Sequence, residues 1–202
     1  MKKTAESITS ICLIFVILWL GLKGNKITIG WVMDERLNNE RQKELRRRIE
    51  RSEDFDQIFE IVKEVVHRDI REHRAGLSLL LSDMPSYIGA YHPVGSNAIV
   101  INRTLINALR KIVTDPRELN YFIFTLLMHE YLHSLGHLDD TEVRVMVANI
   151  CRRSLGEDHI SVRMADGNWI EKYPELRLVE GNFSKEFELV RKFDSSSKTY
   201  FA

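Results

Sequence analysis

The chain has 202 residues, which is enough for one ordinary domain with an extension and too few for two full-sized domains. Hydrophobic residues make up 44% of it and charged residues 29%, a composition that is typical of a globular protein and excludes a disordered or collagen-like chain. Because 29 basic residues balance 29 acidic ones, the basic surplus of a nucleic-acid-binding protein is missing, and we expect no nucleic acid partner. The two cysteines, Cys12 and Cys151, are too few for a disulfide framework or a cysteine-rich zinc site, so any metal ion must be held by His, Asp or Glu.

The first residues of the chain have the pattern of a membrane segment. No charge occurs from Ser7 to Leu22, and residues 11–20 are all apolar. A helix over this stretch rises about 24 Å, and the flanking lysines and the mainly apolar residues 27–33 extend it towards the roughly 30 Å of a bilayer core. No small residues typical of a signal-peptide cleavage site end the run. Residues 1–33 are therefore predicted to be an uncleaved, single-pass membrane anchor, whose orientation the nearly balanced flanking charges leave open.

After the anchor, the sequence predicts a linker followed by one domain. Residues 34–51 are dense in charges of both signs, which is typical of a helical stalk. Residues 52–202 are expected to form an α+β domain with a C-terminal tail that packs on it as strands or a short helix. Ser52 precedes two acidic residues and is a good helix start, and apolar residues then recur at three- and four-residue steps from Phe55 to Ile70. We expect this helix to end near Gly76.

Short β-prone runs separated by turn-rich segments follow that helix. They are Leu77–Leu81, Tyr87–Tyr91 and Ala98–Ile101. We expect them to form a small, twisted, mostly antiparallel sheet. Residues 102–111 are expected to form a short connecting helix.

The strongest helix signal begins at Asp115. Pro116 stands at the first helical position, and Glu118 completes a capping-box pattern. Gly136 is a natural helix end. We therefore predict a helix from Pro116 to about Leu135.

This capped helix carries the pattern H-E-x-x-H in its last turns, from His129 to His133. Because residues four apart lie on the same helix face, both imidazoles can bind one metal ion. Glu130 lies about 100° round the helix from His129, where it can act on a water held by the metal instead of ligating the ion itself. Zinc in such a site polarises a water and a carbonyl group, and the carboxylate takes the water's proton and later donates it to the leaving amine.

The motif on a capped helix, after a sheet and an earlier helix, resembles the zincin class of metallopeptidases. The compact scale is further similar to the small gluzincins called minigluzincins, and the resemblance covers residues 54–166. It implies a zinc cofactor and a fold in which a backing helix, a small twisted sheet and the active-site helix follow one another. In that fold an edge strand binds an extended peptide by adding it to the sheet, and residues 98–101 would be this strand.

The third metal ligand has more than one candidate. In gluzincins it is a Glu on a following helix, and Glu142 meets this requirement nine residues after His133, in the first turn of a helix expected over residues 141–151. His137 is another candidate, although Gly136 is expected to turn it away from the helix face. We take Glu142 as the first choice.

The metzincin pattern offers a different ligand. There the motif extends to H-E-x-x-H-x-x-G-x-x-H, and Gly136 fits while Asp139 occupies the last position, as in the Asp-bearing snapalysin variant. Met164 would then belong to a methionine turn beneath the metal.

Taken together, the patterns predict a membrane-anchored zinc metallopeptidase, an endopeptidase acting on peptides or unfolded proteins. His129, His133 and Glu142 would bind zinc, and Glu130 would be the general base. The alternative is a catalytically silent, membrane-tethered zinc-binding protein on the same scaffold, against which the intact Glu130 argues. A zinc-dependent ribonuclease is disfavoured by the neutral charge balance.

Overall fold

The computed structural model describes residues 35–165, 167 and 169–195. The predicted membrane anchor, residues 1–33, lies outside this part of the chain. Among the residues that the structure describes, no helix has both the length and the apolar character needed to cross a membrane.

The chain divides into two compact units, residues 1–43 and 44–202. In the first unit, residues 35–43 are helical, and Lys43 forms an ion pair with Glu40 across 2.8 Å. The second unit begins with helical residues 44–51, as expected for a helical segment before the domain. All the helices and strands from residue 55 onward belong to this second unit.

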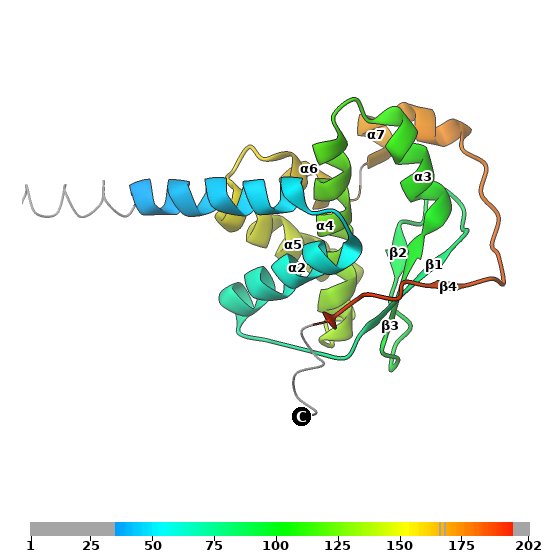
Figure 1. Cartoon of the computed structure of the whole chain (residues 1–202), viewed down its shortest axis with the longest axis horizontal. Coiled ribbons are helices and arrows are strands. Elements are labelled where there is room, and N and C mark those ends of the chain that lie inside the picture. Colours follow the sequence, from blue (N-terminus) through cyan, green and yellow to red (C-terminus); the bar gives the residue numbers. More distant parts are fainter. Residues whose placement is uncertain (1–34, 166, 168, 196–202) are drawn as a thin grey trace, which may run out of the picture. The chain divides into compact units, whose positions relative to one another are not determined.

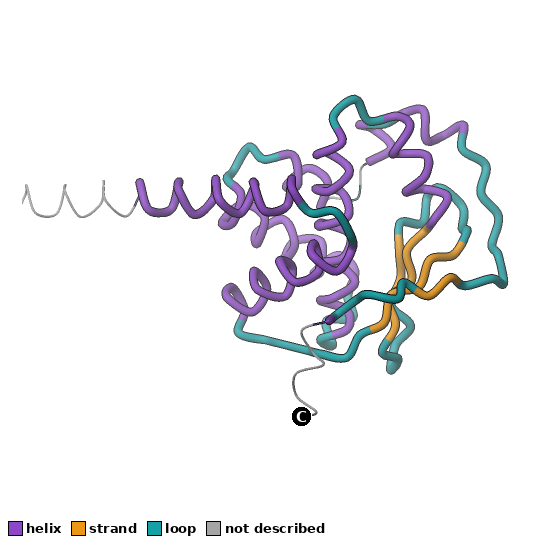
Figure 2. Tube along the Cα trace, viewed as in Figure 1, coloured by secondary structure: helices purple, strands orange, loops and turns teal. Residues whose placement is uncertain are grey.

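The second unit is an α+β domain whose strands gather on one side of a group of packed helices (Figure 1 and Figure 2). In chain order its elements are α2 (Phe55–Ile70), β1 (Ser78–Ser82), β2 (Ala90–Tyr91), β3 (Ala98–Asn102), α3 (Arg103–Ile112), α4 (Pro116–Ser134), α5 (Asp140–Leu155), α6 (Ile160–Ala165), α7 (Trp169–Lys172), the 3-10 helix η1 (Pro174–Leu178) and β4 (Glu188–Leu189). Helices α2, α4 and α5 contact one another, and α3 and α4 both contact the sheet.

The sheet is mixed, with the strand order β2-β3-β1-β4. The predicted antiparallel arrangement is wrong for β1 and β3, which run parallel in the register Ser78↔Ala98 to Ser82↔Asn102. The reason lies in strand β2, which is the outer neighbour of β3 and runs antiparallel to it. Strand β3 therefore runs in the same direction as β1. The prediction that residues 98–101 form the edge strand is therefore also wrong, because β2 and β4 are the outer strands.

Side-chain caps fix the ends of the two long helices. The N-cap of α2 is Asp54, whose carboxylate accepts the Gln57 N–H at 2.8 Å, so the helix begins two residues later than the Ser52 start. It ends at Ile70, well before Gly76, because Arg71 turns into the left-handed region with φ of 63°. The cap of α4 is Asp115 with Pro116 in the first turn, which confirms the predicted start of that helix.

The C-terminal segment closes the core against α2. The Phe193 ring stacks on Phe59 with centroids 4.3 Å apart. The Asp194 carboxylate accepts hydrogen bonds from the Lys63 ammonium and, at 2.9 Å, from the Leu77 N–H. Lys63 is 5% exposed and Asp194 3%, so the pair is buried. The tail is thus an integral part of the domain.

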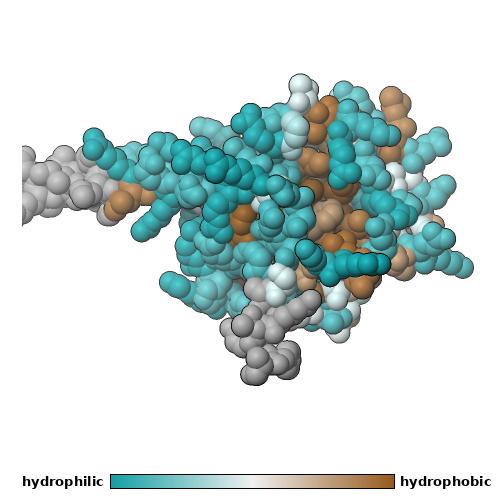
Figure 3. Space-filling view, viewed as in Figure 1, coloured by the Kyte–Doolittle hydropathy of each residue, from teal (hydrophilic) through white to brown (hydrophobic). Residues whose placement is uncertain are grey.

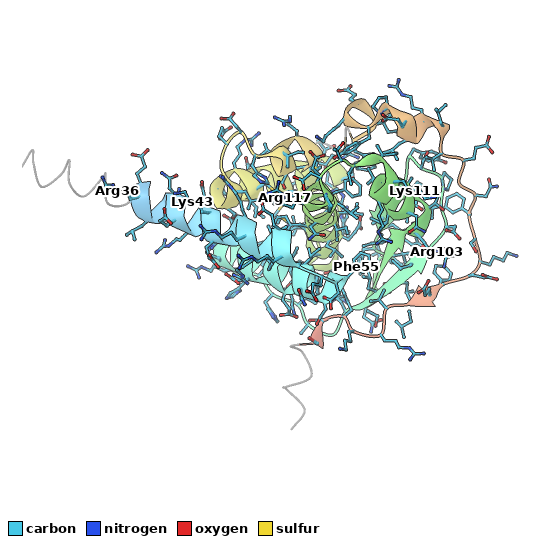
Figure 4. The ribbon with its side chains drawn as sticks, turned by 45° about the horizontal axis from the view of Figure 1, so that its top comes forward. Arg36, Lys43, Phe55, Arg103, Lys111 and Arg117 are labelled. Atoms are coloured by element: carbon cyan, nitrogen blue, oxygen red, sulfur yellow. The ribbon has the colours of Figure 1, made fainter. Side chains whose placement is uncertain are left out.

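Strand β4, nearer the start of the C-terminal segment, is bonded to the first residue of α3. Arg103, at the start of α3, donates to Asp83 at 3.1 Å and to Glu188 of β4 at 3.2 Å (Figure 4). Most of the face seen in Figure 3 is polar, and apolar side chains gather over the side that carries the strands and α3. Exposed large apolar residues of the C-terminal segment are Leu178, Phe183, Phe187 and Leu189.

Candidate metal centre

The two histidines of the H-E-x-x-H pattern meet on one face of α4. The Nε2 atoms of His129 and His133 lie 3.0 Å apart, and the side chains are 18% and 17% exposed. The one-turn spacing in a regular helix brings them together, as the sequence predicts. The pair therefore has the arrangement required to bind one ion.

A carboxylate from the start of α5 completes the group. Asp140 Oδ1 lies 3.0 Å from His129 Nε2 and 3.9 Å from His133 Nε2, and one ligand atom from each residue falls within 4.8 Å of the others. In a tetrahedral zinc site with ligand bonds of about 2.05 Å, ligand atoms are separated by about 3.3 Å. The three atoms thus need to shift by only a few tenths of an ångström to bind such an ion, and two nitrogens with one oxygen are ligands that zinc accepts.

The ligand candidates from the sequence lie elsewhere. Glu142, the first choice, is exposed and is not part of this group. Asp139 is the N-cap of α5, and its carboxylate accepts the Glu142 N–H at 2.8 Å. His137 Nε2 lies 3.1 Å from the Glu72 carboxylate. The structure thus brings Asp140 to the histidines in place of all three.

Sequence reasoning missed Asp140 because it placed the helix start one residue too late, with Asp140 or Thr141 as the cap. The spacing Asp139-x-x-Glu142 is the same capping-box pattern that locates the start of α4. Applied here, it makes Asp139 the cap and Asp140 the first helical residue. Met164, considered for a methionine turn, lies instead within the helix α6 and is 4% exposed.

Hydrogen bonding and burial favour the neutral imidazoles that bind metals. His133 Nδ1 lies 2.6 Å from the His137 carbonyl oxygen, to which it donates, so that Nε2 faces His129 with its lone pair. Burial, reinforced by the neighbouring His133, lowers the pKa of His129 to about 4. Burial opposes ionisation of Asp140, but the hydrogen bond and charge of Arg144 outweigh it and lower the pKa of that carboxyl. At neutral pH His129 is therefore a neutral imidazole and Asp140 a carboxylate.

Glu130 lies beside this group but is buried. It is 3% exposed, and its Oε2 atom has no hydrogen-bond partner among the described residues. The backbone of His92 is near enough to lower the pKa of this carboxyl, but by less than burial raises it. Burial, with the nearby Asp140 charge, raises the pKa of Glu130 to about 8. A carboxyl group with such a pKa exchanges a proton readily near neutral pH.

The outer strand β2 runs next to this part of α4. The Asn102 N–H donates to the Gly89 carbonyl at 2.9 Å, and Tyr91 pairs with Val100 in β3. Because backbone groups of successive strand residues point to opposite sides, those of Ala90 and His92 face away from β3. Ala90 of β2 lines the same pocket as His129 and Glu130, so this outer edge of the sheet faces the H-E-x-x-H motif.

A pocket opens beside the candidate ligands. It has a volume of about 230 Å³ and includes His129, Glu130 and Asp140 in its lining. The rest of the lining is mainly apolar and includes Phe122, Leu126, Val147, Met164 and Trp169. An apolar cavity of about 150 Å³ holds a benzene molecule, so this pocket has room for a large apolar side chain.

Comparison with known proteins found no relative of the chain. No protein-family model matches the chain, and neither the curated proteins nor the solved structures contain a match to it.

Proposed function

We propose that the chain is a zinc-dependent peptidase that cleaves peptide bonds in extended or unfolded segments. The observation that carries the proposal is the convergence of His129, His133 and Asp140 beside a buried Glu130 with one unpartnered oxygen. This donor set also revises the expected ligands, with Asp140 in place of Glu142. The resemblance of the motif to zincins supports the same reading.

The chain's own residues supply the acid–base chemistry. A zinc ion held by the three ligands would supply the Lewis acidity that polarises a water molecule and the carbonyl of the scissile bond. The Glu130 carboxylate is the acceptor for the water's proton, and the same carboxyl group then donates that proton to the leaving amine. Burial favours the first of these steps because it raises the proton affinity of Glu130.

The outer edge of β2 is suited to hold the substrate backbone. The N–H and C=O groups of Ala90 point away from β3 and offer hydrogen bonds to an extended segment. Such a segment lies beside the motif, because Ala90 lines the same pocket as His129 and Glu130. A large apolar side chain of that segment enters the adjacent pocket. An extended backbone is available in peptides and unfolded proteins, which defines the substrate class.

We further propose that residues 1–33 anchor the chain in a membrane. Their charge-free apolar run is the support for this part. Extraction of cell membranes with alkaline carbonate tests it, because a spanning helix stays with the membrane pellet whereas a peripheral protein is released. Recovery of the chain in the supernatant would contradict the tether and leave the catalytic proposal intact.

Zinc content and cleavage of an unfolded protein such as casein, measured on the same samples, test the catalytic proposal. Wild type is expected to hold about one zinc per chain and to cleave. Both properties are expected to fall in His129→Ala and Asp140→Ala. Glu130→Gln is expected to keep the metal and lose cleavage, and Glu142→Gln is the matched control that keeps both.

Three results would contradict the catalytic proposal. Wild type without zinc would show that the histidines are not a metal site. Stoichiometric zinc with equal cleavage by wild type and Glu130→Gln would show that any cleavage comes from elsewhere, and stoichiometric zinc without cleavage would favour the silent zinc-binding protein.

A further inference from the structure

The third candidate ligand is the most exposed of the group. The Asp140 side chain is 56% exposed, against 18% and 17% for the two histidines. It stands at the first position of α5, and its carboxylate can rotate freely unless a neighbour holds it. A ligand with this freedom loses conformational entropy when it binds a metal. Pre-orientation of Asp140 therefore bears directly on metal affinity.

Arg144 provides that orientation from the next turn of α5. Its Nε donates to Asp140 Oδ2 at 2.7 Å, in the one-turn spacing that brings the two side chains together. The other oxygen, Oδ1, is the atom that faces His129 at 3.0 Å. The two oxygens of the carboxylate thus have separate partners, one held by the guanidinium and one directed to the metal group.

The guanidinium of Arg144 packs against the backbone of Gly167. The φ of +75° at Gly167 is a conformation that favours glycine, and a Cβ at this position would overlap Arg144 Nη1 and lie 3.0 Å from Cζ. The backbone at Gly167 therefore lies against the guanidinium, and a side chain at this position would displace the guanidinium from its place. Gly95, by contrast, has a φ of +79° but open space where a Cβ would be.

We propose that Arg144, seated against Gly167, is a positioning residue that orients Asp140 for metal binding. The inference rests on the metal site of the proposed function. Partners of ligands commonly set metal affinity, and their removal typically costs about 10- to 100-fold. Arginine is required because its planar fork fixes a direction, whereas a lysine in the same place is a flexible point charge.

Zinc affinity, measured by competition with a chromophoric chelator on the full chain in nonionic detergent, tests the inference. Arg144→Lys and Gly167→Ala both preserve net charge, so neither changes the long-range field at the metal. Each is expected to weaken zinc binding by about tenfold or more. Because Gly167→Ala acts through the guanidinium, it is expected to add no further loss in an Arg144→Lys background.

Matched controls separate orientation from general damage. Arg152→Lys changes another arginine of α5, which pairs with Glu157 at 3.1 Å, and Gly95→Ala introduces the same backbone strain where nothing contacts the new Cβ. Both are expected to bind zinc like wild type. The visible spectrum of the cobalt-loaded chain provides a second readout, since it responds to ligand geometry and not to overall stability.

The outcomes distinguish this inference from the proposed function. Wild type that binds no zinc overturns the metal site itself. Wild type that binds zinc, with Arg144→Lys and Gly167→Ala as tight as their controls and an unchanged cobalt spectrum, overturns the positioning role alone. If Gly167→Ala fails to fold by circular dichroism, the exchange of Arg144, which is 43% exposed, decides the question.

Discussion

The buried ion pair between α2 and the C-terminal segment should carry a large share of the domain's stability. Lys63 is held by Asp194 and, at 2.7 Å, by Glu60, whose side chain is 34% exposed. Asp194→Ala removes the buried carboxylate, leaves the ammonium with the Glu60 partner, and leaves the Leu77 N–H without its acceptor. Breaking a buried pair costs about 3–5 kcal/mol, and the remaining Glu60 places this case at about 3 kcal/mol.

Thermal unfolding followed by circular dichroism measures the effect. For a domain of this size about 3 kcal/mol corresponds to a fall in Tm of roughly 6–12 °C. The double substitution Lys63→Met with Asp194→Leu is expected to recover part of the loss, because an apolar pair of similar volume has no charge to desolvate, although the Leu77 N–H still lacks its acceptor. A loss below about 1 kcal/mol for Asp194→Ala would refute the reasoning, since it would mean that water reaches the pair.

The same pair predicts a pH dependence. Burial lowers the pKa of Lys63, but its hydrogen bonds to Asp194 and Glu60 outweigh burial and raise the pKa above 10.5. A raised pKa in the folded state contributes stability that is complete below the unfolded value and is lost as pH rises through the folded value. Wild type should therefore lose stability above about pH 10.5. Lys63→Met should not show this component, and identical alkaline profiles would contradict it.

Other parts of the domain yield predictions of their own. Burial raises the pKa of Cys151 to about 12, so in a Cys12→Ser variant the remaining thiol should react with a disulfide reagent at pH 8 only after denaturation; fast labelling of the native chain would disprove its burial. A Cβ on Gly89 would lie 3.2 Å from the Trp169 ring, so Gly89→Ala should reduce cleavage next to large apolar residues and leave zinc content unchanged, which peptide assays and metal analysis check. Burial lowers the pKa of His159 to about 4, and its contribution to stability should be present above pH 6.5 and disappear as pH falls towards 4. The stability of His159→Gln, measured in chelator, should fall less over this range than that of wild type.

Local signals predicted the helices well. The capping residues around Asp115 gave both ends of α4 to within a residue or two, and the apolar periodicity from Phe55 to Ile70 gave α2, although this helix ends well before the expected Gly76. These signals succeed because a cap and an amphipathic face act over a few residues. The same locality placed His129 and His133 on one face, since their spacing alone determines it.

Pairing between distant segments was harder to foresee. The parallel alignment of β1 with β3 depends on where the intervening strand β2 goes, and no single run of residues encodes that choice. The continuous apolar character of Leu79–Leu81 and Ile99–Ile101 was nonetheless a usable signal, because parallel strands are commonly apolar throughout. The third candidate ligand, Asp140, was missed for a smaller reason: the start of α5 lies one residue earlier than predicted, which makes Asp139 the cap.

The closure of the core by residues near the end of the described chain constrains the order of folding during synthesis. Lys63 and Asp194 are 131 positions apart, so the ammonium is made long before the carboxylate that pairs with it. Until Phe193 and Asp194 leave the ribosome, α2 exposes the Phe59 ring and retains a charge that cannot be buried without great cost. The nascent domain should therefore remain open, and dependent on holdase chaperones, until residues 193 and 194 have emerged.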